Sequence, residues 1–297
     1  MPGYLNSILK FRELYGIKDI DEESLERLKK LNYQIKPFIL RRKKQDVLKS
    51  LPDKIENNIY LDLPQTQKTL YLKVLKESEK EINELIETEG FSKARFKILQ
   101  LLMKLRQVCI DPNIKYSNYN GESIKFEKLL EIVKEYISEN HKILIFSSFK
   151  TVIDRENDIF NKENITSYMI DGSVNSKERM NLVEKFNKDD TNCFLITLKS
   201  GGTGLNLTSA DVVIHLDIWW NPQVENQATD RAHRIGQTNK VTVIKLITKG
   251  TIEERIIELQ NKKKILSDNL IEGNNNSETL SNLSENDIRN LLSLGNE

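Results

Sequence analysis

Several large classes of protein are excluded by what this 297-residue chain has little of. Its two cysteines, Cys109 and Cys193, lie far apart, which excludes a disulfide scaffold and indicates a reducing compartment. No apolar run is long enough to cross a bilayer, and no charged segment followed by an apolar one opens the chain, so we expect neither a membrane protein nor a signal peptide. The 45 basic and 44 acidic residues exclude polyanion binding through bulk charge, but they leave room for a local basic groove.

Arginine and glycine are both scarce, and both are concentrated in a few places. Only 12 of the 45 basic residues are arginine, and four of these form two clusters, Arg41–Arg42 and Arg231 with Arg234. Among only 12 glycines, three fall within the four positions 201–204. Clustering of such scarce residues indicates a specific role, so these segments are the first candidates for a functional site.

Short apolar runs alternate with helical segments in the second half of the chain. We expect strands at 143–146, 167–170, 193–197, 211–216 and 241–247, with helices near 151–163 and 175–187 and from about residue 224. Such alternation indicates βαβ units and a parallel sheet, and continuous apolar runs indicate strands that are buried on both faces. A further strand at 55–63, a long helix at 65–89 and a second helix precede this region. The expected fold class is therefore α/β.

The glycine-rich stretch 197–207 directly follows an expected strand. Glycines in that place allow backbone N–H groups to approach a phosphate. No Gly-Lys-Ser/Thr closes the stretch, so it is not a P-loop, and its glycine spacing does not fit the dinucleotide fingerprint. The glycines alone favour a tight crossover turn.

The stretch 225–237 is expected to be helical, which would place Gln227, Arg231 and Arg234 on one face. Two guanidinium groups on one face repel each other unless an anion lies between them, and a γ-phosphate is such an anion. Taken alone, an exposed helix with Asp230 paired locally is the slightly stronger interpretation. His233 has no second His, Cys or carboxylate at metal-ligand spacing, so we expect a packing or hydrogen-bonding histidine and no metal site.

Polar or aromatic residues follow the other expected strands, at the edge where parallel sheets bind ligands. These are Ser147-Ser148, Asp171-Gly172-Ser173 and Trp219-Trp220. Each could be an ordinary turn, but in this order they resemble the second motor lobe of superfamily-two helicases. The resemblance is closest to the switch/sucrose-non-fermenting family of DNA-translocating ATPases, bacterial branch. It covers about residues 1–272 and is carried by DRAHRIGQ (230–237), GGTGLNLTSAD (201–211), ILIFSSF (143–149), MIDGS (169–173), PFILRRKKQDVLKSLPDK (37–54), LMKLRQVCIDP (102–112) and KLITKGTIEERIIELQNKKK (245–264).

The resemblance implies a RecA-like lobe and a division of the chain into four parts. These are N-terminal helices with a basic inter-lobe linker (1–54), a helical protrusion (55–120), the RecA-like helicase C-terminal lobe (121–250), and a brace helix with a tail (251–297). In the family, ATP with Mg²⁺ lies between two such lobes, and the first lobe supplies the P-loop and an acidic magnesium motif. This sequence has neither motif. We therefore expect the C-terminal half of a double-stranded-DNA-dependent ATPase, cut from a larger protein and inactive by itself.

Roles for individual residues on the nucleotide side are implied by the same match. Arg231 and Arg234 would be arginine fingers that stabilise the transferred γ-phosphate, an effect worth roughly 10³–10⁵ in rate. Gln227 would orient one finger and the nucleotide. Gly204 and Asn206 would contact the nucleotide, with Asn206 at the ribose or its water shell.

On the DNA side, the resemblance implies backbone contacts, which carry no sequence information and therefore suit a translocase. These contacts would come from Ser147, Ser148, Gly172, Lys199, Ser200 and Gly201. Trp220 would lie against the groove, while Trp219 packs. In the linker, Arg41 and Arg42 would cross between the lobes and sense their closure.

Two other functions compete with this one. The chain could be a lobe of an RNA helicase, or a non-enzymatic module that binds DNA or a protein and has kept only the fold. The protrusion and the RAHRIGQ phrase argue against the first, and the retained Gln227, Arg231 and Arg234 argue against the second. A composition rich in Lys, Ile and Asn fits an AT-rich bacterial genome. For a DNA translocase of the bacterial branch we expect a cytoplasmic, nucleoid-associated protein.

Overall fold

The computed structural model describes residues 7–15, 26–27, 30–31, 33–34, 36–38, 51–201, 204–269 and 283–292. The chain divides into two compact units, the larger made of Ser50–Ile257 with Thr279–Glu297 and the smaller of Met1–Lys49 with Glu258–Glu278. In the smaller unit, the structure describes helix α1 (Ile8–Tyr15) and the 3₁₀ turn η1 (Lys36–Phe38). The predicted linker residues Arg41 and Arg42 lie outside the described residues.

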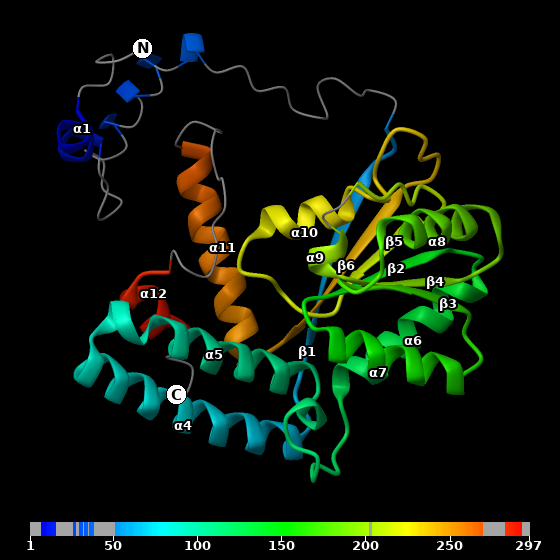
Figure 1. The fold of residues 1–297 in the computed structure, drawn as a ribbon, viewed down its shortest axis with the longest axis horizontal. Coiled ribbons are helices and arrows are strands. Elements are labelled where there is room, and N and C mark those ends of the chain that lie inside the picture. The colour runs from blue at the N-terminus through cyan, green and yellow to red at the C-terminus, as the bar shows by residue number, and fades with distance from the viewer. Residues whose placement is uncertain are drawn as a thin grey trace. The chain divides into compact units, whose positions relative to one another are not determined.

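The larger unit is built on a six-stranded sheet of the order β1-β6-β5-β2-β4-β3, and every neighbouring pair is parallel (Figure 1). This confirms the α/β class. The strands are β1 (Lys54–Leu61), β2 (Ile143–Ser147), β3 (Ser167–Ile170), β4 (Cys193–Thr197), β5 (Val212–His215) and β6 (Val241–Thr248). In β2, β4 and β5 every residue is buried, as continuous apolar runs predict for strands covered on both faces.

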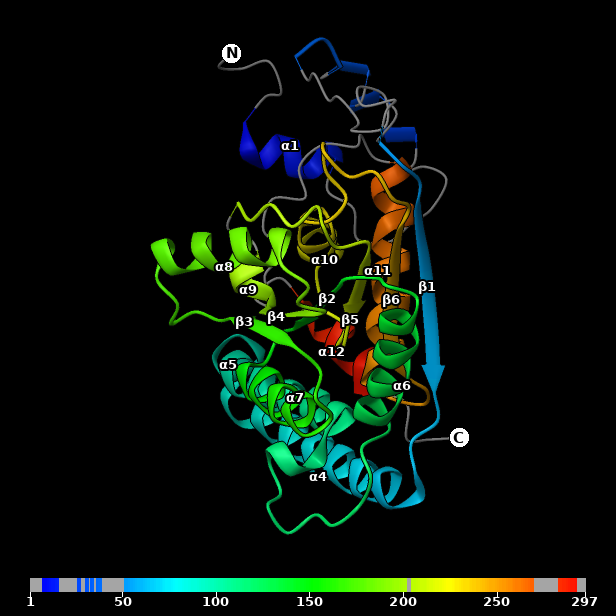
Figure 2. The same cartoon turned by 90° about the vertical axis from the view of Figure 1, so that its right-hand side faces the viewer.

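Helices cover both faces of this sheet (Figure 2). On one face lie α6 (Ile124–Ser138) and α7 (Lys150–Lys162), and on the other α8 (Ser176–Lys188), α9 (Leu198–Gly201) and α10 (Pro222–Thr229). Successive strand side chains point to opposite faces, so Ile143 and Ile145 join the core under α6 and α7 while Leu144 and Phe146 join the other core. Two separate apolar cores therefore hold the strands in place from both sides.

An antiparallel hairpin of two long helices, α4 (Gln65–Glu89) and α5 (Phe91–Ile110), extends from the sheet unit (Figure 1). Gly90 joins them at a φ of 77°, a left-handed conformation that glycine adopts without a steric penalty. The short turn η2 (Pro112–Ile114) follows α5, and α12 (Glu285–Leu292) is tied to α5 because Arg95 donates a 2.7 Å hydrogen bond to the Leu283 carbonyl. The backbone N–H groups of Ser284 and Asp287 each donate to the other's side chain, which forms a capping box at the start of α12.

Strand β1 belongs to the sheet, although the sequence-based division groups it with the helical protrusion. Its residues pair with β6 from Lys54 opposite Val241 to Leu61 opposite Thr248. Helix α11 (Ile252–Asn269) follows β6, and its first residues, with Ile252 and Ile256 buried, pack in the larger unit. Within the described part of the chain, no helix is both long enough and apolar enough to span a membrane.

Candidate functional site

Because all six strands run in the same direction, the segments that follow them meet at one edge of the sheet. Two groups of contacts are found there. One joins the glycine-rich stretch after β4 to the arginine stretch after α10. The other joins the ends of β2 and β5 to helix α5.

The first group centres on Arg231, whose Nε donates to the carbonyl oxygen of Gly201 at 2.7 Å. In return, the backbone N–H of Leu207 donates to the Arg231 carbonyl oxygen at 3.0 Å. Gly201 itself is closely packed, since a Cβ there would lie 2.8 Å from the Phe146 ring. The two stretches singled out in the sequence are therefore in direct contact.

The shared helical face predicted for Gln227, Arg231 and Arg234 is wrong, because α10 ends at Thr229. Beyond it the backbone tightens: the N–H groups of Arg231 and Ala232 bond to carbonyls three residues back, and that of Arg234 bonds to the carbonyl of Ala232. Gln227 is thus on the helix, while both arginines lie in the turn that follows.

The two arginines nevertheless interact electrostatically. Burial lowers the pKa of the Arg231 guanidinium, and the positive charge of Arg234 lowers it further. Arg231 is only 9% exposed, whereas Arg234 is exposed. An anion that contacted both groups would relieve this repulsion, so the chemistry of the turn fits a phosphate.

Two neighbouring side chains hold this turn in place. His233 donates from Nε2 to the Pro52 carbonyl oxygen at 2.8 Å, as expected for a hydrogen-bonding histidine. Gln237 donates to the Ala210 carbonyl oxygen at 2.7 Å. Both contacts anchor the turn to segments that lead into strands.

The second group centres on Asp217, just beyond β5. One of its oxygens accepts hydrogen bonds from the Ser147 hydroxyl at 2.7 Å and from the Ser148 backbone N–H at 2.9 Å. The other accepts from the Ser148 hydroxyl and, at 2.6 Å, from Nη2 of Arg106 on α5. A single buried carboxylate thus fixes the end of β2 and ties it to the helical hairpin.

A third predicted position, Gly172, lies in a turn after β3 that is held by Asp171. This carboxylate accepts from the Ser173 backbone N–H at 2.7 Å and pairs with Lys150, at 2.5 Å, at the start of α7. Hydrogen bonding to Lys150 and Ser173 keeps the pKa of Asp171 well below its usual range. Gly172 stays exposed, with open space around its α-carbon.

Exposure separates the predicted site residues into two sets. The exposed set, which a ligand can reach directly, is Gly172, Lys199, Gly204, Asn206, Gln227 and Arg234. Ser148 is half-buried. The buried set is Ser147, Ser200, Gly201, Trp220 and Arg231.

The structure corrects the expectation for several of the buried residues. Trp220, expected to lie against a DNA groove, is only 6% exposed, because its ring packs on the Arg106 guanidinium. The Ser147 hydroxyl donates a hydrogen bond to Asp217, and the Ser200 hydroxyl accepts one from Thr197. Both hydroxyls therefore have partners inside the protein. Of the two tryptophans, the half-buried Trp219 is the more exposed.

Arg106 and Asp217 were not predicted as site residues. Neither residue belongs to a periodic pattern in the sequence. The 111 positions between them also mean that no local spacing indicates their pairing. The scarcity of arginine offered a signal, since Arg106 interrupts an otherwise apolar helix face at Leu102, Leu105 and Cys109.

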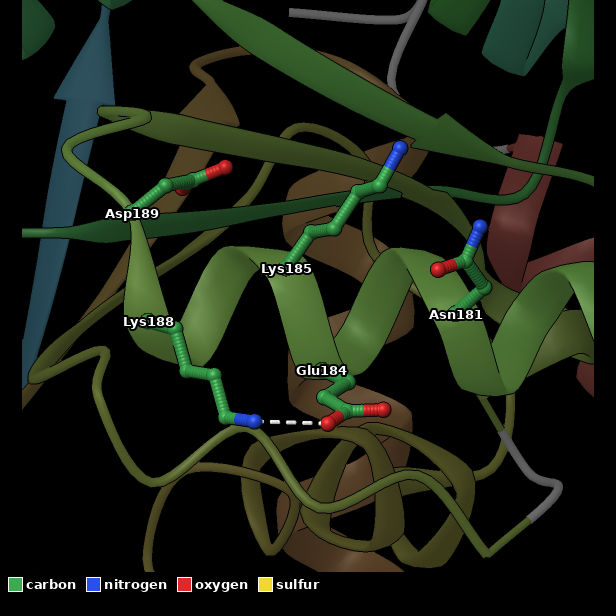
Figure 3. Close-up of a pocket in the computed structure, with 5 residues that line it drawn as sticks. All are labelled: Asn181, Glu184, Lys185, Lys188 and Asp189. Atoms are coloured by element: carbon green, nitrogen blue, oxygen red, sulfur yellow. Dashed lines mark hydrogen bonds and ion pairs between the residues drawn. The ribbon is translucent and has the colours of Figure 1, made fainter.

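A shallow hollow on α8 lies apart from this edge (Figure 3). It is lined by Asn181, Glu184, Lys185, Lys188 and Asp189, and an ion pair of 2.6 Å joins Lys188 to Glu184. These residues lie towards the carboxyl end of α8, which leads back to the start of β4. The residues that the structure describes contain no group of three or more His, Cys, Asp or Glu that could hold a metal ion.

Comparison with known proteins adds two family matches. A helicase conserved C-terminal domain matches residues 124–236, and an SNF2-related domain matches residues 1–114. Among curated proteins, an uncharacterized ATP-dependent helicase of Mycoplasma pneumoniae is 40% identical over 287 residues. The match takes in 95% of this chain but 27% of that protein, so the chain spans only about a quarter of the relative's length.

Two solved structures from Sulfolobus solfataricus share the fold. The C-terminal domain of a SWI2/SNF2 ATPase is 31% identical with a TM-score of 0.65, covering 82% of this chain and 99% of that one. The SWI2/SNF2 ATPase core in complex with dsDNA is 34% identical with a TM-score of 0.66, covering 98% of this chain and 61% of that one.

Proposed function

Since the chain belongs to the SNF2-related family of ATP-dependent helicases and has its RecA-like fold, we propose that it forms the second lobe of an ATP-driven double-stranded-DNA translocase. The observation that carries this proposal is the junction of Arg231 with Gly201, beside the exposed Arg234. It brings the nucleotide and DNA stretches into direct contact. A change at a bound phosphate can therefore reach the DNA-facing loop through a single hydrogen bond.

On the nucleotide side, Arg231 and Arg234 stabilise the charge that develops on the transferred γ-phosphate, while Gln227, Gly204 and Asn206 contact the rest of the nucleotide. ATP with Mg²⁺ supplies the phosphoryl chemistry when bound. We assign the ligands of the metal, together with the P-loop, to the other lobe, because the first lobe supplies both motifs in the family that this chain resembles and this sequence contains neither. This chain alone then has negligible ATPase activity.

On the DNA side, contacts to the phosphate backbone come from the exposed Lys199 and Gly172 and the half-buried Ser148. Double-stranded DNA is the proposed substrate because the matched Sulfolobus solfataricus core is a complex with dsDNA. Gly201 and Ser200, buried beneath Lys199, shape this loop from inside.

The test is the Arg231→Ala variant of the protein that joins this lobe to its P-loop lobe. DNA-stimulated ATP turnover is expected to fall by about 10³-fold or more, as for the loss of an arginine finger, while DNA affinity changes little. Arg231→Lys keeps the charge but loses the forked donor pair, so we expect only a small recovery.

Arg289→Ala, at an exposed position of helix α12, is the control and is expected to leave turnover unchanged. Retained turnover in Arg231→Ala would remove the finger role. Turnover that RNA stimulates better than DNA would instead identify an RNA helicase lobe. Robust hydrolysis by the 297-residue chain would contradict its assignment as a second lobe.

A further inference from the structure

Helix α5 carries a guanidinium group that is completely removed from solvent. Arg106 and its partner Asp217 both have fully buried side chains, and their ion pair measures 2.6 Å. Burying two charges costs more desolvation energy than a single pair readily returns, and apolar residues of similar volume often stabilise a fold better. Stability alone therefore does not explain an arginine at this position.

Aromatic rings surround the same guanidinium. Its central carbon lies 5.0 Å from the Trp219 ring centroid, 5.4 Å from that of Trp220 and 5.2 Å from that of Phe149. These are cation–π distances, at which the ring quadrupole attracts the positive charge. The three rings come from the segments that follow β2 and β5, so Arg106 contacts both.

The hydrogen bonds of Arg106 are concentrated on one nitrogen. Nη2 donates to Asp217 at 2.6 Å, to the Ile218 carbonyl oxygen at 2.8 Å and to the Ser148 hydroxyl at 2.9 Å. Among the described residues, Arg106 Nε and Nη1 have no hydrogen-bond partner, and neither has Trp220 Nε1. Buried donors without an acceptor are unusual. Hydrogen bonding alone therefore does not explain why the arginine is placed here.

We propose that Arg106 is a positioning residue that holds the Ser148 hydroxyl and the Trp219–Trp220 segment in the geometry that receives the DNA backbone. It acts through Ser148 and Asp217 and does not touch DNA, since it is fully buried. This inference rests on the proposed function, because it gives Ser148 a DNA contact. It also makes the base of the helical hairpin part of the DNA-binding edge.

The experiment is a double-mutant cycle on the 297-residue chain, with a short DNA duplex as the probe and affinity measured at fixed low salt. Ser148→Ala is expected to weaken binding about 3- to 10-fold, the range of one net hydrogen bond. Arg106→Lys keeps the charge but loses the planar group, and we expect a similar loss. Because both changes act on one contact, the double variant should bind no more weakly than the weaker single variant.

Arg155 provides a control with similar partners, although its side chain is 43% exposed. It too pairs with a buried aspartate, Asp111, at 2.8 Å and lies over an aromatic ring, Phe126, at 5.7 Å, but it makes no contact with Ser148. Arg155→Lys should leave DNA affinity unchanged. Equal losses in the two lysine variants would reduce Arg106 to a structural role.

A second readout does not need DNA. Trp219 and Trp220 are the only tryptophans of the chain, and both pack on Arg106, so tryptophan emission, excited at wavelengths that tyrosine does not absorb, reports this cluster alone. Arg106→Lys should increase acrylamide quenching of this emission, and Arg155→Lys should not. Unchanged quenching would contradict the proposed hold on the two rings.

The outcomes distinguish this inference from the proposed function. If Ser148→Ala weakens binding and Arg106→Lys does not, the positioning role is wrong while the DNA-binding edge stands. If the wild-type chain binds no DNA, both are wrong. Should thermal unfolding show that Arg106→Lys does not fold, Asp217→Asn, which preserves side-chain volume, takes its place with the same expected loss.

Discussion

At the scale of single residues, Glu156 adds its own contribution to the pH dependence of stability. It lies on α7 against the sheet, is fully buried, and neither carboxylate oxygen has a hydrogen-bond partner among the described residues. Burial raises its pKa from 4.5 to about 8, although Arg155 opposes part of that shift. The folded protein therefore keeps a proton on Glu156 at neutral pH that the unfolded chain has already lost.

The contribution of Glu156 to the free energy of unfolding should consequently decrease between about pH 4.5 and 8, by up to about 1.4 kcal/mol per pH unit, while buried His215, whose pKa is lowered to about 3, contributes the opposite slope below about pH 6.5. Glu156→Gln is neutral at every pH and should remove the slope that Glu156 contributes. Urea unfolding at pH 5, 6.5 and 8 is the measurement, and the advantage of the variant should grow with pH. Asp158→Asn, an exposed change on the same helix, is the control. Parallel stability curves for wild type and Glu156→Gln would contradict the prediction.

At the scale of elements, one buried lysine connects α6, two strand ends and α11. Lys125 donates to the carbonyl oxygens of Leu216 and Leu246 at 2.6 and 2.8 Å and to Glu253 at 2.7 Å. Glu253 in turn accepts from the Thr248 N–H at 3.0 Å. The start of α11 is therefore fixed to the sheet by a network in which every Lys125 donor is used.

Lys125→Met should cost about 3–5 kcal/mol of unfolding free energy, because it leaves Glu253 charged and unpaired in the interior. Adding Glu253→Gln should recover part of that loss, which a urea-unfolding series can measure. Lys128→Met, on the same helix, removes only a partly exposed pair with Glu131 and should cost less than about 1 kcal/mol. Similar losses of unfolding free energy for the two methionine variants would mean that the buried network stabilises the fold no more than the partly exposed pair does.

The sequence predicted some elements better than others, for physical reasons. The buried strands, such as β4 at Cys193–Thr197, were found at their observed positions because parallel strands covered on both faces form uninterrupted apolar runs. The end of α10 was missed because local spacing continues the helix pattern, while the observed turn depends on distant partners such as the Gly201 carbonyl. Pairs such as Arg106 with Asp217 exist only after folding and have no period to detect.

The near-neutral charge of the whole molecule shapes its proposed DNA binding. With a net charge of only +1, attraction must come from a few placed cations and not from bulk charge. Lys199, exposed at the carboxyl edge of the sheet, is one of these.

Lys199→Ala should lower the slope of log affinity against log salt by about 0.9, the contribution of one phosphate contact. Lys188→Ala is the matched control, because Lys188 lies on α8 and already pairs with Glu184. Titrating a DNA duplex at several salt concentrations measures both slopes. An unchanged slope for Lys199→Ala would exclude its phosphate contact.

The pairing of β1 with β6 has a consequence for the order of events during synthesis. Of the six strands of this sheet, β1 is made earliest and β6 last, and the two pair at one end of the sheet. At typical ribosomal elongation rates, synthesis of the chain between them takes roughly 10–40 s. The hairpin of α4 and α5 can form early, since its contacts are local, whereas β1 must wait for a partner. Until then the backbone N–H and C=O groups on the pairing edge of β1 have no partner, so this sheet is most vulnerable to aggregation at β1 during synthesis.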